Sequence, residues 1–324
     1  MKLPITRTTL TRAALFTVTL VLAALAAEAA TRWLYRDITT SADSNGYFSR
    51  RWAAQGTATL NSAGFRGPEF TIEKPPGIYR IAAIGDSFTY GNGIGQHERY
   101  TDVLQARLPK HFEVLNFGYA GANTPQHLQR VKQLIPEIRP DFILLQWYVN
   151  DVEGSNSSGR PSFRPLMPVH PWHNWLTQHS AFYNVASVRW AEMQIQLGMT
   201  TSYPEYLRRR FADPNTREAR ADREALEEIV RFAKAQGVPI GIVLFPDTSG
   251  DLDEGYAFGF LHEHVLAVCA AHDIDCLDLR KDFAAIKDRR TLWANRLDHH
   301  PSARAHAIAA VRILETYASA WAKP

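Results

Sequence analysis

A short apolar run, followed at once by a glycine, a carboxylate and a serine, constrains this chain more than any other feature. Residues Ile81–Ile84 are apolar, with Pro75-Pro76 shortly before them and Gly85 directly after. This length and these boundaries favour a buried strand of a parallel sheet over a helix. Asp86 and Ser87 then lie at the carboxyl end of the strand, where ligands bind in open α/β sheets. We expect Gly85 to permit a sharp turn that leaves Ser87 exposed.

Other serine and glycine motifs do not fit this stretch. The segment Gly91–Gly95 is rich in glycine, but it lacks the G-x-G-x-x-G spacing and no Gly-Lys-Ser/Thr follows it. Ser87 does not stand in a G-x-S-x-G motif. A serine between a strand and a turn can also simply cap a helix. The role of Ser87 therefore depends on the residues at the ends of the other predicted strands.

Apolar runs alternate with segments of helical spacing along most of the chain. The predicted strands cover residues 81–84, 112–116, 141–147, 238–245 and 274–279, and the predicted helices cover 98–108, 125–137, 216–236, 253–272 and 302–321. This rhythm indicates a parallel sheet with right-handed crossovers. We expect a flavodoxin-like three-layer α/β/α sandwich with a mainly parallel five-stranded sheet over residues 79–324, preceded by a polar lead-in at 37–78.

An insertion at about 152–212 interrupts this rhythm. Its first part is rich in Ser, Pro, Trp and His without a clear period, while 180–197 and 203–211 are short candidate helices. A long irregular insertion at the carboxyl end of a strand is typical of a lid or a binding loop. Its aromatic residues Trp172, Trp175 and Trp190 have two interpretations: they stack on sugar rings, or they form a satellite core under the loop.

Polar residues also follow the second and third predicted strands and precede the last helix. These blocks are Asn116-x-Gly118-x-x-Gly121-x-x-Thr124, Asn150-Asp151 and Asp298-His299-His300-Pro301. Acyl transfer needs a nucleophile, a base, a group that orients the base, and donors for the oxyanion. Taken separately, such glycines and an Asn-Asp pair are ordinary turn residues. Together with Gly-Asp-Ser at 85–87 they resemble the blocks of the SGNH/GDSL hydrolase family, over roughly residues 79–320.

This resemblance assigns a role to each block. It implies that Ser87 is the nucleophile, that His300 is the general base, and that an aspartate, here Asp298, orients His300. It also implies an oxyanion hole made by the backbone N–H groups of Ser87 and Gly121 and by the side-chain amide of Asn150. Loss of one such donor typically reduces the rate by about 10²–10³.

The last block departs from the family pattern. In the family, the aspartate commonly precedes the histidine by three residues, but Leu297 occupies that position here and cannot orient an imidazole. Asp298, two residues before His300, must substitute. His299 is the rival base, although Pro301 and the following helix favour His300.

Two other features of the blocks are expected to be structural. We expect Gly118 to serve only a tight turn. We expect Asp86 and Asp151 to be structural hydrogen-bonding groups rather than catalysts.

The first 36 residues are not part of the predicted domain. Lys2, Arg7 and Arg12 precede the apolar run Ala13–Ala27, which Glu28 ends. The run is short for a membrane span, and the Ala-Glu-Ala sequence at 27–29 resembles a signal cleavage site. Both interpretations export the chain, because the cations precede the run. We favour an uncleaved inner-membrane anchor with a periplasmic catalytic domain; a cleaved signal would give a secreted protein.

Composition limits the partners and cofactors. The net charge of the 324 residues is +3, which is too small and too scattered to indicate a nucleic-acid partner. The two cysteines, Cys269 and Cys276, either pair in an oxidising compartment or remain buried thiols.

No metal or other cofactor is expected. His262 and His264 are two residues apart and so lie on different faces of a helix, and no H-E-x-x-H motif occurs. His170 and His173 lie in a predicted loop without nearby carboxylates. We expect all four to be surface or packing histidines.

The sequence therefore predicts a membrane-anchored serine esterase. Its substrates would be small-molecule or glycan esters, in particular O-acetyl groups, cleaved through an acyl-enzyme. The alternatives are an O-acetyltransferase that uses the same site on an extracytoplasmic polysaccharide, and a catalytically silent glycan-binding protein.

Overall fold

The sheet contains five parallel strands in the order typical of a flavodoxin-like fold. The computed structural model describes residues 7–43, 45–56, 58–153 and 171–321. The strands are β1 (Tyr79–Gly85), β2 (Phe112–Gly118), β3 (Phe142–Trp147), β4 (Ile240–Leu244) and β5 (Cys276–Asp278). They pair in the order β2-β1-β3-β4-β5, and every pairing is parallel. Their carboxyl ends therefore lie along one edge of the sheet.

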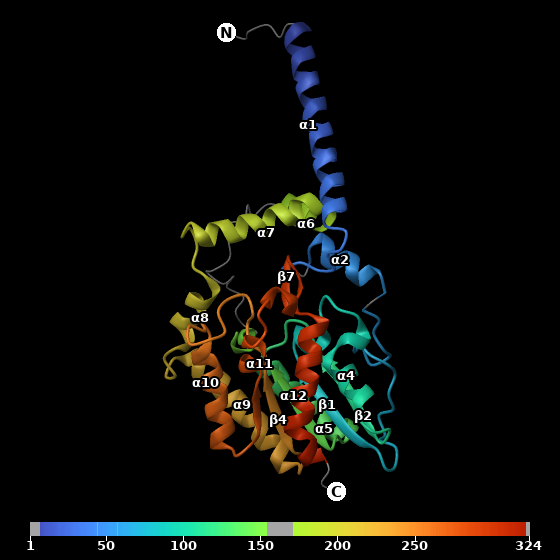
Figure 1. The fold of residues 1–324 in the computed structure, drawn as a ribbon, viewed down its shortest axis with the longest axis vertical. Helices are drawn as coiled ribbons and strands as arrows, with labels where there is room; N and C mark the ends of the chain where they lie inside the picture. The colour runs from blue at the N-terminus through green and yellow to red at the C-terminus, as the bar shows by residue number, and fades with distance from the viewer. Residues whose placement is uncertain (1–6, 44, 57, 154–170, 322–324) are drawn as a thin grey trace.

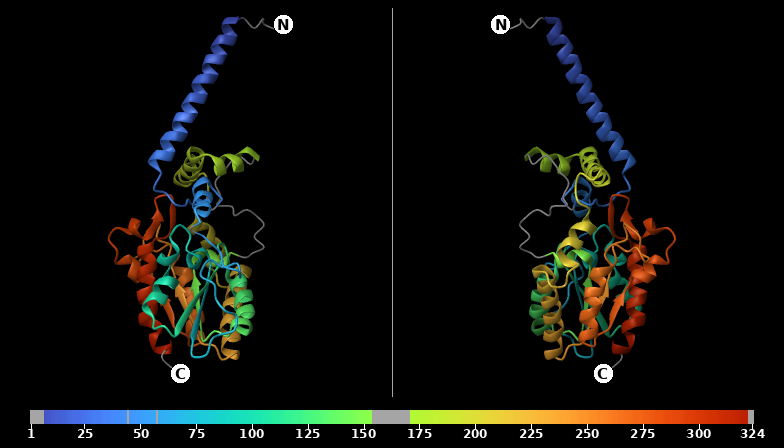
Figure 2. Two further views of the ribbon diagram at one scale, coloured as in Figure 1. Left: turned by 90° about the vertical axis from the view of Figure 1, so that its right-hand side faces the viewer. Right: turned by 90° about the vertical axis from the view of Figure 1, so that its left-hand side faces the viewer.

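Helices cover both faces of this sheet. One layer contains α4 (Tyr100–Arg107) and α12 (Ala303–Trp321), and the other contains α5 (Thr124–Ile138), α9 (Arg217–Ala235) and α10 (Gly259–Ala271). Figures 1 and 2 show the sheet between the two layers. The predicted three-layer α/β/α sandwich is confirmed.

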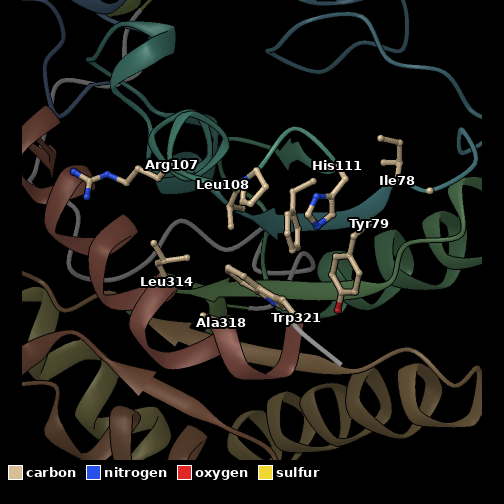
Figure 3. A pocket seen from close by; sticks show the side chains of 11 residues that line it. Ile78, Tyr79, Arg107, Leu108, His111, Leu314, Ala318 and Trp321 are labelled. Atoms are coloured by element: carbon tan, nitrogen blue, oxygen red, sulfur yellow. The ribbon is translucent and has the colours of Figure 1, made fainter. Parts of the chain in front are cut away.

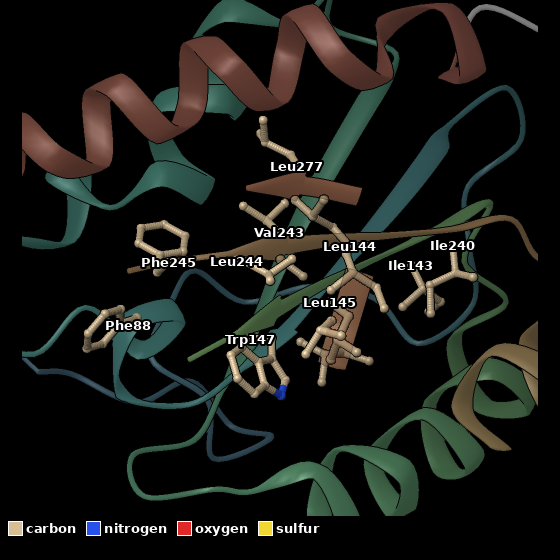
Figure 4. Close-up of a cluster of buried hydrophobic side chains, with 14 of the residues drawn as sticks. Phe88, Ile143, Leu144, Leu145, Trp147, Ile240, Val243, Leu244, Phe245 and Leu277 are labelled. Atoms are coloured by element: carbon tan, nitrogen blue, oxygen red, sulfur yellow. The ribbon is translucent and has the colours of Figure 1, made fainter. Parts of the chain in front are cut away.

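The strands are apolar on both faces because both faces of the sheet pack against helices. In Figure 4, Val243 and Phe245 point toward α12, whereas Leu145 and Trp147 point toward α5. All four side chains are fully buried. Because helices remove both faces of the sheet from water, the central strands carry continuous apolar runs rather than alternating ones.

Some predicted boundaries were wrong. Helix α10 begins at Gly259 rather than near residue 253, because the preceding residues form turns in which the Tyr256 N–H bonds the Asp253 carbonyl. The lead-in contains a helix that was not predicted, α2 (Tyr47–Ala54). Cys269, in α10, and Cys276, in β5, form a disulfide, which decides between the two interpretations of the cysteines.

Short elements lie near the edge of the sheet where the strands have their carboxyl ends. They are α3 (Ser87–Tyr90), η1 (Gln96–Glu98), η2 (Val149–Val152), α11 (Arg280–Ala284), η3 (Arg289–Leu292) and a two-stranded antiparallel sheet of β6 (Trp293–Asn295) and β7 (Asp298–Pro301).

The N-terminal helix α1 (Arg7–Leu34) projects away from the domain (Figure 1). It has 28 residues, and its most apolar window is not buried by the rest of the chain. It is long and apolar enough to cross a membrane, and it extends beyond the predicted apolar run in both directions.

The described part of the insertion is helical. It forms α6 (Pro171–His179), α7 (Ala181–Gln196) and α8 (Tyr203–Phe211), while the predicted irregular stretch at 154–170 lies outside the described residues. Trp172, Trp175 and Trp190 are 67%, 52% and 38% exposed. The satellite-core interpretation of these tryptophans is therefore wrong.

Candidate active site

Ser87 is the first residue of the one-turn helix α3, directly after β1. Asp86 caps this helix: its carboxylate accepts a hydrogen bond from the Phe88 N–H at 2.9 Å. The cap makes the chain turn at the carboxyl end of β1. Ser87 is 6% exposed, so its hydroxyl lies at the surface of the core rather than standing free in solvent.

Gly85 is required for a reason that differs from the predicted one. Its backbone is not in the left-handed region, but a Cβ there would lie 2.1 Å from the Thr89 hydroxyl and 2.3 Å from Gln146 Oε1. Gln146 Oε1 accepts hydrogen bonds from the Asp86 N–H, the Thr89 N–H and the Thr89 hydroxyl. A glycine is therefore needed so that Gln146, from β3, can reach the turn and hold it. Sequence reasoning missed Gln146, although a glutamine in a fully buried strand was an available signal.

His300 lies in β7, and its imidazole reaches the Ser87 hydroxyl. The Nε2 atom is 2.9 Å from Ser87 Oγ, and Nδ1 is 2.5 Å from Asp298 Oδ1. The same carboxylate oxygen accepts the His300 backbone N–H at 3.1 Å. Asp298 is 2% exposed. The structure thus brings together the predicted Ser87, His300 and Asp298 in a chain of hydrogen bonds.

The charges of this pair reinforce each other. Burial lowers the pKa of His300, but the charge and hydrogen bond of Asp298 outweigh burial, so that the pKa is raised above 6.5. Burial raises the pKa of Asp298, but the charge and hydrogen bond of His300 outweigh it and the net direction is downward. Asp298 therefore favours an imidazolium at His300, which is the state that a general base reaches when it takes a proton.

His299 does not reach Ser87. Its side chain is exposed, and its ring lies against the indole of Trp293 with the centroids 4.2 Å apart. Successive side chains of a strand point to opposite faces. Asp298 and His300 consequently share one face of β7, and His299 takes the other.

The lead-in contributes to the site, which sequence reasoning missed. The Ala42 N–H donates to the Leu297 carbonyl at 2.7 Å, directly before Asp298. After the charge and hydrogen bond of His300, the buried hydroxyl of Thr40 also contributes to the lowered pKa of Asp298. The Thr39 hydroxyl donates to the Gly93 carbonyl at 2.9 Å. Residues 39–42 thus pack against the β7 segment that carries Asp298.

The three predicted oxyanion donors follow three adjacent strands. Ser87 follows β1, Gly121 follows β2 and Asn150 lies in η2 after β3, and β1 pairs with both of its neighbours. Gly121 is exposed and has a φ of 79°, a conformation that favours glycine. The topology therefore brings these donors to the edge of the sheet where Ser87 lies.

Gly118 has a different role from the predicted tight turn. Its φ is not positive, and a Cβ there would lie 2.2 Å from the backbone N of Tyr90 in α3. Asn116 bonds the same helix, because its amide donates to the Thr89 carbonyl at 2.6 Å. The second block therefore packs β2 against the helix that carries Ser87.

Three buried titratable groups, Asp86, His127 and Asp151, include the residue directly before Ser87. Burial, followed by the charge of Asp151, raises the pKa of Asp86 to about 6. Burial raises the pKa of Asp151 well above its ordinary range and lowers the pKa of His127 to about 4. Asp151 accepts the Tyr148 N–H at 3.0 Å and lies 3.4 Å from His127 Nε2. These bonds are consistent with structural roles for the two aspartates.

The candidate metal residues separate into different pairs. His262 bonds Asp278 at 3.0 Å, and His264 bonds Asp222 at 3.1 Å. His170 lies outside the described residues. Within the described ranges, no three His, Cys, Asp or Glu side chains lie together as a metal site would require.

A cavity of about 760 Å³ lies at the other end of the sheet (Figure 3). It is lined by residues at the amino ends of β1 and β2, such as Tyr79 and Phe112, and by Trp321 of α12. Because Ser87 follows the carboxyl end of β1, this cavity is not part of the candidate site.

A family model, the GDSL-like Lipase/Acylhydrolase family, matches residues 83–308. The match includes Ser87, Gly121, Asn150, Asp298 and His300 but not the lead-in, and it confirms the predicted resemblance. No match was found among curated proteins. A solved member of the lipolytic protein G-D-S-L family from Veillonella parvula is 16% identical, with a TM-score of 0.46 and coverage of 74% of this chain and 98% of that one. An acetylxylan esterase from Geobacillus stearothermophilus, solved as a catalytic mutant, is 15% identical, with a TM-score of 0.44 and coverage of 76% and 96%.

Proposed function

The chain belongs to the GDSL-like lipase/acylhydrolase family, and on this basis we propose that it is a serine esterase that cleaves small acyl esters through an acyl-enzyme at Ser87. One observation carries the proposal: Ser87 Oγ lies 2.9 Å from His300 Nε2, and His300 Nδ1 lies 2.5 Å from Asp298. A nucleophile, a base and a group that orients the base are connected by successive hydrogen bonds. This geometry also argues against a catalytically silent protein.

The proposed reaction has two halves. His300 Nε2 takes the hydroxyl proton while Ser87 Oγ attacks the carbonyl carbon of the ester, and Asp298 stabilises the imidazolium that forms. The N–H groups of Ser87 and Gly121 and the amide of Asn150 stabilise the oxyanion. Collapse of the tetrahedral intermediate breaks the ester C–O bond, and His300 gives its proton to the leaving alcohol. Water then loses a proton to His300 and attacks the acyl carbon. The bond between this carbon and Ser87 Oγ breaks, His300 returns the proton to Ser87 Oγ, and the acid leaves.

The surroundings of Ser87 support a small acyl group. The rings of Phe88 and Tyr148 lie 4.1 Å apart by centroid, and the ring of Phe88 lies 5.5 Å from that of His300. These aromatic rings fill space beside the nucleophile, so we assign O-acetyl esters, including those on glycans, as the substrate class.

Access of water supports hydrolysis over transfer to a sugar. The side chain of His300 is 25% exposed, and Gly121 is exposed. Transfer requires that the acceptor exclude water and be held in line with the acyl group. An acyl donor supplied with candidate oligosaccharides should therefore yield free acid as the main product, as followed by mass spectrometry.

We assign α1 to an uncleaved membrane anchor with the catalytic domain outside the cytoplasm. Cleavage at the Ala-Glu-Ala sequence would remove Glu28 or detach it from the domain, yet Glu28 accepts hydrogen bonds from Ser180, Ala181 and Phe182. A reporter fused after Pro324 should be active only outside the cytoplasm, and the intact chain should sediment with membranes. A soluble mature chain that begins near Ala30 would contradict the assignment.

The catalytic assignment is tested by covalent labelling. A serine-directed phosphonate should modify the protein at Ser87, and Ser87→Ala should abolish both the labelling and the esterase activity. Ser302→Ala is the matched control, because Ser302 caps α12 in the block that contains His300 and its hydroxyl accepts the Ala305 N–H. Labelling at another serine, together with full activity of Ser87→Ala, would refute the proposed nucleophile.

A further inference from the structure

Helix α7 presents an apolar stripe to its surroundings. Phe182, Ala186, Trp190, Met193 and Leu197 are all exposed. They are spaced by three or four residues and so lie on one face of the helix, continuing just past its last turn. A helix on the surface of a soluble protein normally turns polar residues to water. An exposed contiguous apolar surface of this kind indicates a binding partner. We call these five residues the α7 stripe.

The rest of the chain covers the other side of α7. Ala181 is fully buried in a cluster with Ile38, Phe48 and Leu297. Asn184 is also fully buried, and its Oδ1 accepts the Ser41 hydroxyl at 3.2 Å. The polar Asn184 thus faces the domain while the apolar stripe faces outward, which is the reverse of a helix adapted to water.

The first turn of α7 is fixed to the end of α1. The Glu28 carboxylate accepts hydrogen bonds from the Ser180 hydroxyl at 2.7 Å and from the N–H groups of Ala181 and Phe182, both at 3.0 Å. A carboxylate at a helix N-terminus is favoured by the helix dipole and by the free N–H groups there. Figures 1 and 2 show α7 running across the direction of α1 at this junction. If α1 crosses a membrane, α7 therefore runs along the membrane surface.

The length of α1 sets the level of this junction. At about 1.5 Å per residue, Glu28 lies about 24 Å along the helix from Arg12 and about 32 Å from Arg7. The hydrocarbon core of a bilayer is about 30 Å thick. If Arg7 lies at the cytoplasmic boundary of the hydrocarbon core, Glu28 lies close to the opposite boundary. If Arg12 lies there instead, Glu28 lies a few ångströms inside the core. The junction between α1 and α7 is therefore held at the level of the membrane–water interface on the non-cytoplasmic side.

We propose that α6 and α7 lie in the membrane–water interface on the non-cytoplasmic side of the membrane that α1 crosses, with the α7 stripe in contact with lipid. The catalytic site then acts on esters carried by molecules in or attached to this membrane. The partner is the bilayer itself. Exposed tryptophans lie on the elements around this junction, with Trp33 near the C-terminal end of α1 and Trp172 and Trp175 on α6. Tryptophan is enriched at membrane interfaces because its ring is apolar and its N–H is polar. According to this proposal, these tryptophan side chains and Trp190 contact lipid rather than stack on sugar rings.

The hairpin of β6 and β7, which carries Asp298 and His300, lies next to α1 and α7. The Arg296 guanidinium donates to the Leu34 carbonyl at the end of α1 at 2.7 Å, and Leu297 packs in the cluster that contains Ala181 of α7. Asp298 follows directly. In Figure 1, β7 lies beneath α7, while the C-terminus lies at the opposite end of the domain. The site is thus on the side of the domain that faces the membrane. This part of the inference rests on the proposed esterase function.

The membrane contact can be tested without activity. A nitroxide is attached at Met193→Cys in the full chain, reconstituted in phosphatidylethanolamine–phosphatidylglycerol vesicles. Ala235→Cys, exposed at the end of α9, is the control. The native cysteines form a disulfide, so each variant offers one free thiol. At residue 193, collisions with oxygen should exceed those with a water-soluble nickel complex, and the reverse should hold at 235. Water-like collisions at 193 would overturn the proposal. So would protection from both reagents, which would indicate a second copy or another protein on the stripe.

The substrate side is tested with one acetyl ester presented in two ways, soluble or attached to a lipid in the same vesicles. The variant W190S/M193S should lose at least about tenfold in rate on the vesicle-borne ester and change less than about twofold on the soluble ester. Ile72→Ser, at an exposed apolar residue outside the stripe, is the matched control and should change neither rate. Equal losses on both esters would overturn the assigned substrate class. Failure of the wild type to exceed Ser87→Ala on either ester would refute the esterase function instead, and the nitroxide result would still decide the membrane contact.

Discussion

The Asp298→Asn substitution tests the site most directly, because it keeps the shape of the side chain and removes its charge. Asp298 Oδ1 accepts both His300 Nδ1–H at 2.5 Å and the His300 backbone N–H at 3.1 Å. An asparagine oxygen can still accept the backbone bond. It cannot stabilise the imidazolium to the same extent. The effect should therefore appear in the rate rather than in the fold.

The size of the effect follows from the charge pair. Two unit charges about 4 Å apart interact by about 4 kcal/mol at an effective dielectric constant of about 20. Because each 1.36 kcal/mol of activation free energy corresponds to about a factor of ten in rate, full loss corresponds to about 10³. The side chain of His300 is 25% exposed, and solvent screens part of the interaction. We expect kcat/KM to fall by about 10²–10³, much less than the roughly 10⁶ that loss of a serine nucleophile causes.

The pH dependence gives a second, independent readout. His300 must be neutral to act as a base, so kcat/KM of the wild type should fall as the pH drops through the raised pKa of His300, above its ordinary 6.5. Removing the charge of Asp298 removes a cause of that rise. The acidic limb of the profile should therefore move to lower pH in Asp298→Asn.

The assay is a pH–rate profile with a soluble acetyl ester, measured for Asp298→Asn and for a matched control. Asp278→Asn is that control, because Asp278 pairs with His262 Nδ1 at 3.0 Å in the same manner but away from Ser87. It should leave the acidic limb in place. A wild-type rate and an unmoved limb in Asp298→Asn would refute the reasoning and mean that another group orients His300.

Three further changes have defined outcomes. His300→Ala should lower kcat by about 10⁴–10⁶ while His299→Ala lowers it by less than about threefold; the reverse ranking in steady-state assays would exchange their roles. Gly118→Ala should destabilise the protein by about 1–3 kcal/mol in urea unfolding, because its Cβ would lie 2.2 Å from a backbone nitrogen of α3; an unchanged midpoint would contradict this. Replacing Cys269 and Cys276 by serine should cost about 2–3 kcal/mol, since the bridge spans only seven residues, and reduction of the wild type should lower its stability equally.

Local patterns predicted much of the fold because strands and helices each produce a characteristic short-range period of apolar residues. The buried run at Ile81–Ile84 and the polar residues after it identified both strand β1 and the candidate nucleophile. The choice of Asp298 over Leu297 was also reached from chemistry alone. Its physical reason is in the structure: residues two apart on β7 share one face, so Asp298 and His300 point the same way.

Some contributions could not be read locally. Gly85 and Gly118 were expected to serve turns, whereas the structure uses them for close approach by Gln146 and by α3. Thr40 lies in a segment that has no motif of its own, and its effect depends on packing against Asp298. Such contacts are decided by neighbours that are distant in the sequence.

The sequence by itself determined the order of strands and helices, the polar residues at their ends and the apolar N-terminal helix, because each depends on residues within a few positions of one another. Only the tertiary structure decided which of these meet. Ser87 and His300 are 213 residues apart, and Glu28 and Ser180 are 152 apart. The first contact exists because β7 packs against α3 at the edge of the sheet where β1 ends, and the second because α7 packs against α1.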